Sequence, residues 1–255
     1  MGLSRRQSLK ALATVAAIPS TGLAARVRPV AGIRLVVLDV GGTIIEDRGD
    51  VPQALSSALA HYGIESSAEE IRRRRGSSKL EIVRYFVEKQ TLPASTDRNQ
   101  LTASIYGEFS SNLMEAYRSV PPIAGAEEAI RQMRRDGYLL ATTTGFDRAV
   151  TTSIFKRLGW EEYFAASICS DDVLRGRPAP FMLFHAMEAA RVDNVAEVMA
   201  VGDTPLDLQA GTNAGLRAVV GVLTGASDIG ALRREPHTHI LESVAQLPSL
   251  LRSRA

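Results

Sequence analysis

The chain has 255 residues, of which 45% are hydrophobic and 23% are charged, values typical of a globular protein with a substantial core. Its net charge of +2 comes from residues 1–30, which carry five basic side chains and no acid; removing these five from the 30 basic residues leaves 25 against 28 acidic ones, a net charge of −3. This balance does not support nucleic-acid binding, which requires clustered positive charge on the folded domain.

Residues 1–29 have the composition of an export signal. Arg5 and Arg6 are followed by a hydrophobic residue and Lys10, and the weakly hydrophobic run Ala11–Ile18 comes next. This order resembles a twin-arginine signal, so we expect an exported, periplasmic or extracytoplasmic protein, or a cytoplasmic one if the signal is not functional. The apolar run is too short to cross a bilayer, and we expect no stable membrane insertion.

Strand and helix patterns alternate after residue 30. Short apolar runs rich in β-branched residues predict strands, and amphipathic segments between the later strands predict helices. The alternation predicts an α/β fold, with a Rossmann-like parallel sheet covered by helices on both faces. The expected strands are Ile33–Val40, Tyr138–Thr144, Ala166–Ser170, Val198–Val201 and Ala218–Leu223, and the expected helices are Ala126–Arg135, Ala149–Leu158, Ala179–Ala190 and Leu206–Ala214.

The segment between the first two strands interrupts this alternation. Residues 52–120 contain helical patterns and no strand pattern, and they are too many for a simple crossover connection. We therefore expect an inserted helical cap over residues 52–120 and a core formed by residues 30–51 and 121–255. A cap inserted directly after the first strand would cover the carboxyl end of that strand, where it could exclude water and select substrates.

Chemically distinctive residues follow four of the expected strands. Asp39 ends the first strand and precedes two glycines, Thr144 ends the second, Arg177 follows the third, and Asp203 and Asp207 follow the fourth. Each residue alone has an ordinary structural explanation, such as a turn or a helix cap. The carboxyl ends of parallel strands meet at one edge of a sheet, where open α/β sheets bind their ligands. The shared position therefore predicts one site.

With these motifs, the chain resembles the haloacid dehalogenase superfamily of hydrolases over residues 33 to about 225. The resemblance implies that Asp39 is a nucleophile that forms an aspartyl-phosphate, which water then hydrolyses. It also implies that the Thr144 hydroxyl binds the transferring phosphoryl group and that Arg177 takes the place of the usual lysine. The residues expected to bind the substrate are Gly42, Thr43, Gly145 and Arg75.

The resemblance also implies a Mg²⁺ cofactor. The expected metal site consists of Asp39, Asp203, the backbone carbonyl of Gly41 and, in support, Asp207. Carboxylates are the hard oxygen donors that Mg²⁺ takes, and a metal with one cation neutralises the charge that develops in phosphoryl transfer. Asp203 and Asp207 share a helix face if that helix begins near Thr204.

Two departures from the common pattern narrow the branch of the superfamily. Most phosphatases of the superfamily carry a second aspartate two residues after the nucleophile, which transfers protons to and from the substrate; here that position is Gly41. Arg177 in place of lysine is the second departure. Both resemble the phosphonoacetaldehyde hydrolase (phosphonatase) branch, in which a cap lysine forms a Schiff base with the substrate aldehyde.

The cap segment around Lys79 matches the spacing of that branch and puts this lysine at the Schiff-base position. Ile82 stands where the branch has histidine, and Arg75 stands where it has methionine. A lysine becomes a nucleophile only when burial or neighbouring charge lowers its pKa, and Arg75 would contribute repulsion. Arg75 also ends the basic run Arg72–Arg75, of which we expect one or two side chains to face the site. Phe146 is a candidate for the pocket wall, although core packing explains it as well.

The expected function is Mg²⁺-dependent hydrolysis of a small phosphorylated or phosphonate metabolite through Asp39. One alternative is phosphonoacetaldehyde hydrolysis, which cleaves a carbon–phosphorus bond with a Schiff base on Lys79. A haloacid dehalogenase is disfavoured by Asp203 and Asp207, because dehalogenases work without a metal. A non-catalytic binding protein is supported only by Gly41. We expect no nucleic-acid partner, and the sequence is compatible with a homodimer.

Overall fold

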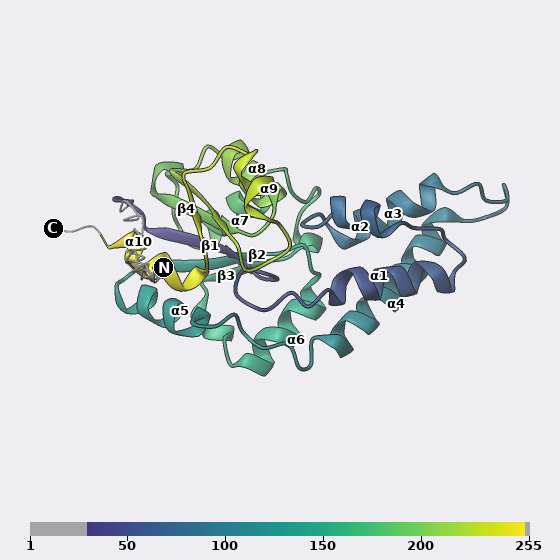
Figure 1. The fold of residues 1–255 in the computed structure, drawn as a ribbon, viewed down its shortest axis with the longest axis horizontal. Coiled ribbons are helices and arrows are strands. Elements are labelled where there is room, and N and C mark those ends of the chain that lie inside the picture. The colour runs from purple at the N-terminus through teal and green to yellow at the C-terminus, as the bar shows by residue number, and fades with distance from the viewer. Residues whose placement is uncertain (1–29, 253–255) are drawn as a thin grey trace, which may run out of the picture.

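The computed structural model describes residues 30–252, so the predicted export signal lies outside the described residues. The described chain forms an α/β core with a helical cap at one end (Figure 1), which confirms the predicted fold class. Six parallel strands form one sheet in the order β3-β2-β1-β4-β5-β6. The strands are β1 (Leu35–Asp39), β2 (Leu139–Thr143), β3 (Ala166–Ile168), β4 (Val198–Gly202), β5 (Ala218–Val222) and β6 (His239–Leu241).

Helices cover both faces of the sheet, with α5, α6 and α10 on one side and α7, α8 and α9 on the other (Figure 1). Their faces are amphipathic, and the buried side chains of α5 follow a helical spacing that turns them toward the sheet. The core helices are α5 (Ala126–Arg135), α6 (Arg148–Leu158), α7 (Phe181–Ala189), α8 (Pro205–Asn213), α9 (Ile229–Arg233) and α10 (Leu247–Leu251).

Strand β1 lies in the middle of the sheet, between β2 and β4. All five of its residues are buried, because successive side chains of a strand point to opposite faces and both faces are covered. Val36 packs in the same cluster as Ile130 of α5, whereas Val37 packs with Leu183 of α7. This double burial fixes the strand and holds Asp39 at its carboxyl end.

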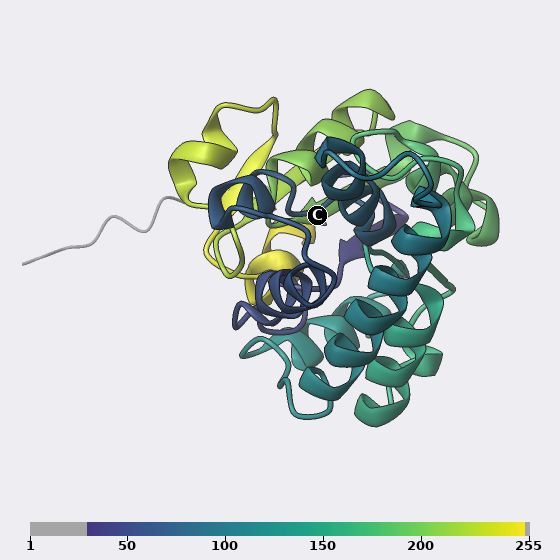
Figure 2. The same ribbon diagram turned by 90° about the vertical axis from the view of Figure 1, so that its right-hand side faces the viewer.

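Four helices between β1 and β2 form the cap, which faces the viewer in Figure 2. Helix α4 packs against both α1 and α3, and their buried apolar side chains, including Leu59, Phe86 and Phe109, continue the core cluster into the cap. The Asp97 side chain accepts hydrogen bonds from the first backbone N–H groups of α4, which defines where this helix begins. The helices are α1 (Asp50–His61), α2 (Ala68–Arg73), α3 (Lys79–Lys89) and α4 (Arg98–Ala116).

The expected elements agree with the observed ones apart from shifts at their ends. Helix α5 has the predicted bounds, and α1 begins at Asp50, slightly before the expected start of the cap. Sequence patterns assigned no element after Leu223, but β6, α9 and α10 follow there. These elements are three to five residues long, too short to show a clear period. Within residues 30–252, no helix combines the length and the apolar character needed to cross a membrane.

Candidate active site

A cavity that is partly open to solvent lies between the cap and the carboxyl edge of the sheet. Its core side is formed by residues that follow four strands, as the sequence predicted. The cap supplies the facing wall, which is mostly apolar. The core residues brought together there are Asp39, Thr144, Arg177, Asp203 and Asp207.

Arg177 is the centre of the core side. Its Nη1 donates to Asp39 Oδ1 at 2.8 Å and to Asp207 Oδ1 at 2.9 Å. Its Nη2 donates to the backbone carbonyl and to the hydroxyl of Thr143, both at 2.9 Å. The Arg177 side chain is only 4% exposed, so one buried guanidinium joins two carboxylates to the end of β2.

The carboxylates of Asp39, Asp203 and Asp207 form a buried acidic cluster, with oxygens within 4.8 Å of one another. Burial raises the pKa of Asp39 to about 6, against the attraction of Arg177 and with added repulsion from Asp207. Burial and the nearby Asp39 raise the pKa of Asp203 as well. Arg177 therefore does not compensate the whole negative charge, and a divalent cation bound here would relieve the repulsion.

Asp203 and Asp207 reach this cluster by different routes. Helix α8 begins at Pro205, after its N-cap Thr204, so Asp203 lies before the helix and the two carboxylates do not share a helix face. Asp203 Oδ2 accepts from the backbone N–H of Ala226 at 2.6 Å. Asp207 Oδ2 accepts from the backbone N–H and the hydroxyl of Thr204, at 3.0 and 2.5 Å. Both Asp207 oxygens thus have partners, since Oδ1 binds Arg177.

Thr144 follows β2 with its side chain 2% exposed and on the cavity wall. Its Oγ1 accepts a hydrogen bond from the backbone N–H of Phe146 at 3.1 Å, which leaves the O–H to donate into the cavity. Gly41 and Gly145, also predicted site residues, line the same cavity. Phe146 lines it as well.

Lys79 is the first residue of α3 and reaches the cavity from the cap. Its Nζ donates to the Ser77 carbonyl at 3.0 Å and lies 5.6 Å from the centre of the Phe146 ring. Burial lowers the pKa of Lys79 to about 8, opposed by the attraction of Asp39, and repulsion from Arg177 and then Arg75 lowers it further. The expected effect of Arg75 is therefore present but secondary to burial.

Arg75 also lines the cavity, where its guanidinium forms an ion pair with Asp47. Asp47 lies in the loop between β1 and α1, so the pair joins the core segment to the loop before α3. Of the other arginines in the basic run, Arg73 pairs with Glu69 on the surface and Arg74 stacks on a tyrosine ring. One side chain of the run thus faces the cavity.

The loop before α3 touches the core through backbone. A Cβ atom built on Gly76 would lie 2.6 Å from the Thr204 hydroxyl, and one built on Gly145 would lie 2.6 Å from the Ser77 carbonyl. Gly76 also has φ +90°, a conformation that only glycine adopts readily. These two glycines allow the loop that carries Lys79 to lie directly against the carboxyl edge of the sheet.

Two predicted substrate-binding residues lie away from the cavity wall. Gly42 is buried against Asp203, and Thr43 is fully buried, with its hydroxyl unpaired among the described residues. Sequence reasoning missed Asp47 and Tyr117, which line the cavity. Tyr117 follows the last helix of the cap, and no motif marks either residue, so only the fold reveals their position.

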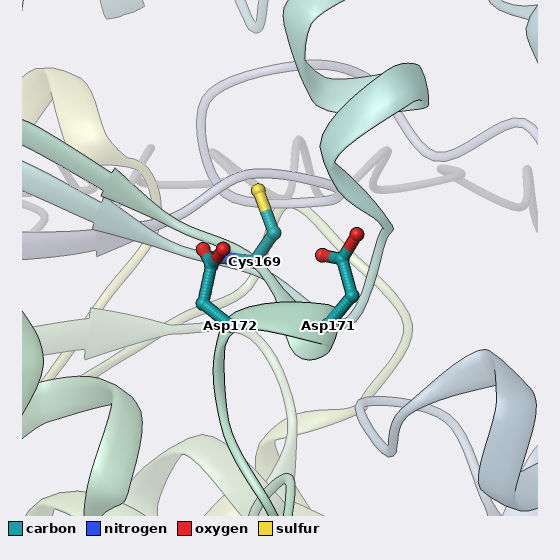
Figure 3. A group of neighbouring side chains, drawn as sticks. All are labelled: Cys169, Asp171 and Asp172. Carbon is teal, nitrogen blue, oxygen red and sulfur yellow. The ribbon is translucent and has the colours of Figure 1, made fainter.

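A second group of possible metal ligands lies outside this cavity. Cys169, Asp171 and Asp172 cluster after β3 (Figure 3). The Asp171 carboxylate accepts from the backbone N–H of Arg148, and Asp172 accepts from the Cys169 N–H and pairs with the Arg148 guanidinium. These contacts account for both carboxylates, which hold the start of α6 against this turn.

Comparison with known proteins places this chain among hydrolases. A family model described as haloacid dehalogenase-like hydrolase matches residues 36–221. A phosphonoacetaldehyde hydrolase from Bacillus cytotoxicus is 28% identical and covers 87% of this chain and 88% of its own. Another from Bacillus cereus is 31% identical, with 80% of each chain covered.

Solved structures show the same fold. A phosphonoacetaldehyde hydrolase-like protein from Oleispira antarctica has a TM-score of 0.75 and 20% identity, over 90% of this chain and 95% of its own. A predicted phosphoglycolate phosphatase from Haemophilus somnus has a TM-score of 0.73 and 17% identity, over 87% of this chain and 99% of its own. At these identities, the likeness concerns the fold.

Proposed function

The chain belongs to the haloacid dehalogenase-like hydrolases and is related to phosphonoacetaldehyde hydrolases, and from this premise we propose that it hydrolyses a small phosphorylated or phosphonate compound through an aspartyl-phosphate on Asp39. The observation that carries the proposal is the buried cluster in which Arg177 holds Asp39 beside two further carboxylates. Such a cluster of charged groups is costly to bury. Phosphoryl transfer gives a reason for it, because the reaction needs a nucleophile, a cationic side chain and ligands for a metal ion in one place.

The described residues support definite roles in this reaction. Asp39 would attack phosphorus through the carboxylate oxygen that does not bind Arg177, while the guanidinium fixes the orientation of the carboxylate. The free O–H of Thr144 would donate to an oxygen of the transferring group. Asp207, whose oxygens bind Arg177 and Thr204, would hold the Arg177 guanidinium and the start of α8 in place. The apolar cap wall would exclude bulk water from the phosphoryl group.

The donor set fits Mg²⁺. Asp39 and Asp203 each offer a carboxylate oxygen, and Gly41, whose backbone carbonyl would be a further ligand, lines the same cavity. Bound there, Mg²⁺ would stabilise the negative charge that develops on the phosphoryl oxygens.

Phosphonoacetaldehyde is a second candidate substrate. It is favoured by Lys79, a buried amine in the same cavity, whose pKa burial lowers to about 8. Attack by the neutral amine on the aldehyde carbon would expel water and form a Schiff base. The resulting iminium would then accept the electron pair of the breaking carbon–phosphorus bond. Schiff-base formation also requires proton transfer to the departing oxygen. Ile82 lines the cavity and has no proton to transfer, so this transfer falls to other groups or to water.

The first experiment measures phosphate release from a panel of phosphate esters and phosphonates with Mg²⁺. Asp39→Asn is expected to lower kcat by about 10⁴-fold or more, because the amide is not a nucleophile. Asp193→Asn is a matched control, since Asp193 is an exposed carboxylate outside the cavity. Full activity of Asp39→Asn would exclude the proposed phospho-enzyme.

The second experiment tests the Schiff base. Borohydride added with phosphonoacetaldehyde is expected to trap one adduct on the wild-type chain, detected by mass spectrometry, and none on Lys79→Ala. Lys156→Ala is the control, because Lys156 is exposed on α6. If the wild type forms no adduct, carbon–phosphorus cleavage by this route is excluded, and hydrolysis through Asp39 is still open to the first test.

A further inference from the structure

Tyr117, which follows α4, brings a phenolic hydroxyl to the cavity. The residue is 3% exposed, and its ring meets that of Phe146 edge to face, with centroids 5.2 Å apart. Among residues 30–252, its hydroxyl makes no hydrogen bond to protein. The hydroxyl oxygen is not among the fully buried unpaired polar atoms of the described residues, so it opens onto the cavity, where its partner is water or a ligand.

The geometry of phosphoryl transfer defines which part of a ligand this hydroxyl would meet. The attacking and leaving atoms lie roughly in line across phosphorus. Because Asp39 attacks from the core side, the leaving atom points toward the cap. The polar side chains of that wall are Arg75, Lys79 and Tyr117. Arg75 is paired with Asp47, and Lys79 donates to the Ser77 carbonyl, so Tyr117 is the one without a protein partner in the described chain.

The Tyr117 hydroxyl also lies close to Gly41. A Cβ atom built on Gly41 would lie 3.2 Å from Cζ of Phe146 and 3.8 Å from the Tyr117 hydroxyl oxygen. The aromatic pair therefore occupies the space that a side chain at position 41 would enter. A polar group next to the nucleophile loop on this side comes from Tyr117 and not from position 41.

We propose that Tyr117 is a catalytic residue whose hydroxyl donates a hydrogen bond to the leaving atom of the substrate. This inference rests on the proposed phosphoryl transfer to Asp39. It also identifies the substrate class, because such a donor matters most for phosphate esters whose leaving oxygen is strongly basic, as in an alkyl phosphate.

The step balances without another reactant. An Asp39 carboxylate oxygen forms a bond to phosphorus, the bond from phosphorus to the leaving oxygen breaks, and that oxygen keeps the electron pair. The Tyr117 O–H stabilises the charge on this oxygen, which then takes a proton from solvent water. Water next attacks the phosphorus, the Asp39 carboxylate leaves with its electron pair, and phosphate and a proton are released.

The test compares two esters in the presence of Mg²⁺: an alkyl phosphate, glycerol 2-phosphate, and 4-nitrophenyl phosphate, whose leaving group needs little stabilisation. Tyr117→Phe keeps the ring and its packing and removes only the hydroxyl. It is expected to lower kcat/KM about 100-fold for the alkyl ester and less than about 5-fold for the aryl ester. Tyr62→Phe is the matched control, because Tyr62 is 38% exposed and lies outside the cavity wall; no loss is expected for either ester.

A loss of equal size for both esters would show that the hydroxyl only supports the structure, and it would overturn the proposal. Unchanged activity of Tyr117→Phe would overturn it too, as would a wild type that hydrolyses neither ester. The underlying function is judged separately by Asp39→Asn. If Asp39→Asn stops turnover and Tyr117→Phe has no effect, the proposed function stands and the role of Tyr117 is wrong.

Discussion

The two walls of the cavity are built in opposite ways. On the core side, Arg177, Asp39 and Asp207 are buried and bound to one another, so each side chain is held by charged neighbours. On the cap side, the polar groups are few: Arg75 pairs with Asp47, and Lys79 and Tyr117 lie among apolar side chains. The difference indicates that the core wall holds the nucleophile and its charged partners, whereas the cap wall determines which substrates and leaving groups the site accepts.

This contrast has a physical basis. A buried ion cluster is stable only if every member is present, because removing one leaves an uncompensated charge in a medium of low polarity. A polar side chain of the cap wall that is not part of such a cluster leaves no uncompensated buried charge when it is replaced by one of similar shape. We therefore expect substitutions in the core cluster to change stability and activity together, and shape-conserving substitutions of polar cap residues to change substrate preference more than folding.

The largest effect is expected for Arg177→Met. Asp39 and Asp207 would lose their cation while staying buried, so the free energy of unfolding should fall by about 3–5 kcal/mol and phosphate release should be lost. Urea unfolding and an activity assay measure the two effects. Arg131→Met on α5 is the control; it breaks an exposed pair with Glu127 and should cost less than about 1 kcal/mol. An equal loss of unfolding free energy in the two variants would contradict the proposed dependence of the core wall on its buried ion cluster.

The next effect concerns pH in the metal-free protein. Because the pKa of Asp39 is raised from 3.8 to about 6, the folded protein retains a proton that the unfolded chain has lost in this range. The free energy of unfolding in EDTA should therefore fall as the pH rises from 4 to 6.5, by about 3 kcal/mol from Asp39 alone, and the raised pKa of Asp203 acts in the same direction.

Above pH 6.5, added Mg²⁺ should restore stability by binding the ionised carboxylates. Urea unfolding at several pH values, with EDTA or Mg²⁺, tests both statements. Asp39→Asn should reduce the pH dependence because residue 39 then has no proton to lose, while Asp203 still titrates. Stability that rises with pH in EDTA would show that Arg177 compensates the cluster without a metal.

A smaller and different effect is expected for Arg75→Met on the cap side. If the guanidinium contributes to binding an anionic substrate, KM should rise about tenfold with kcat nearly unchanged. The free energy of unfolding should fall by about 1–2 kcal/mol, less than for Arg177→Met, because Asp47 loses its partner but keeps some contact with solvent. Arg73→Met, which breaks an exposed pair with Glu69, should leave KM unchanged. A loss of kcat comparable to that of Arg177→Met would place Arg75 among the chemical groups.

The smallest effect is expected at a helix start in the cap. Asp97→Ala removes the N-cap of α4 and should lower the free energy of unfolding by about 1 kcal/mol with unchanged kcat. Asp207→Ala also removes an N-terminal partner, that of α8, but it uncouples Arg177 as well. It should therefore reduce both stability and kcat. If Asp97→Ala and Asp207→Ala change the unfolding free energy and kcat equally, the proposed difference between the core and the cap is wrong.

The core side was predictable because strand order determines it. An apolar run followed by Asp39, and the same pattern before Thr144 and Asp203, were sufficient to place these residues at one edge. Position in the chain does not reveal side-chain partners, so neither the pair of Arg75 with Asp47 nor the approach of Tyr117 could be inferred. Both depend on how the cap packs against the core.

The two glycines predicted to bind substrate show the same difference between position in the chain and packing in the fold. Gly145 lies two residues after the end of β2 and lines the cavity, where a substrate could approach it. Gly42 lies in a tight turn against Asp203, so the absence of a side chain there allows the loop to pack closely. A glycine in a motif marks a close approach, but the sequence alone does not reveal whether a ligand or the protein makes it.

The contact of Gly76 and Gly145 across the two walls has a consequence for the evolution of such enzymes. The loop that carries Lys79 meets the core at Gly76, which lies against the Thr204 side chain, and at the Ser77 carbonyl, which lies against Gly145, so these contacts do not use the side chains of Arg75 or Ile82. Arg75 and Ile82 can be replaced without losing that contact. A lineage could therefore acquire new substrates by changing single cap residues while the nucleophile and its partners stay as they are.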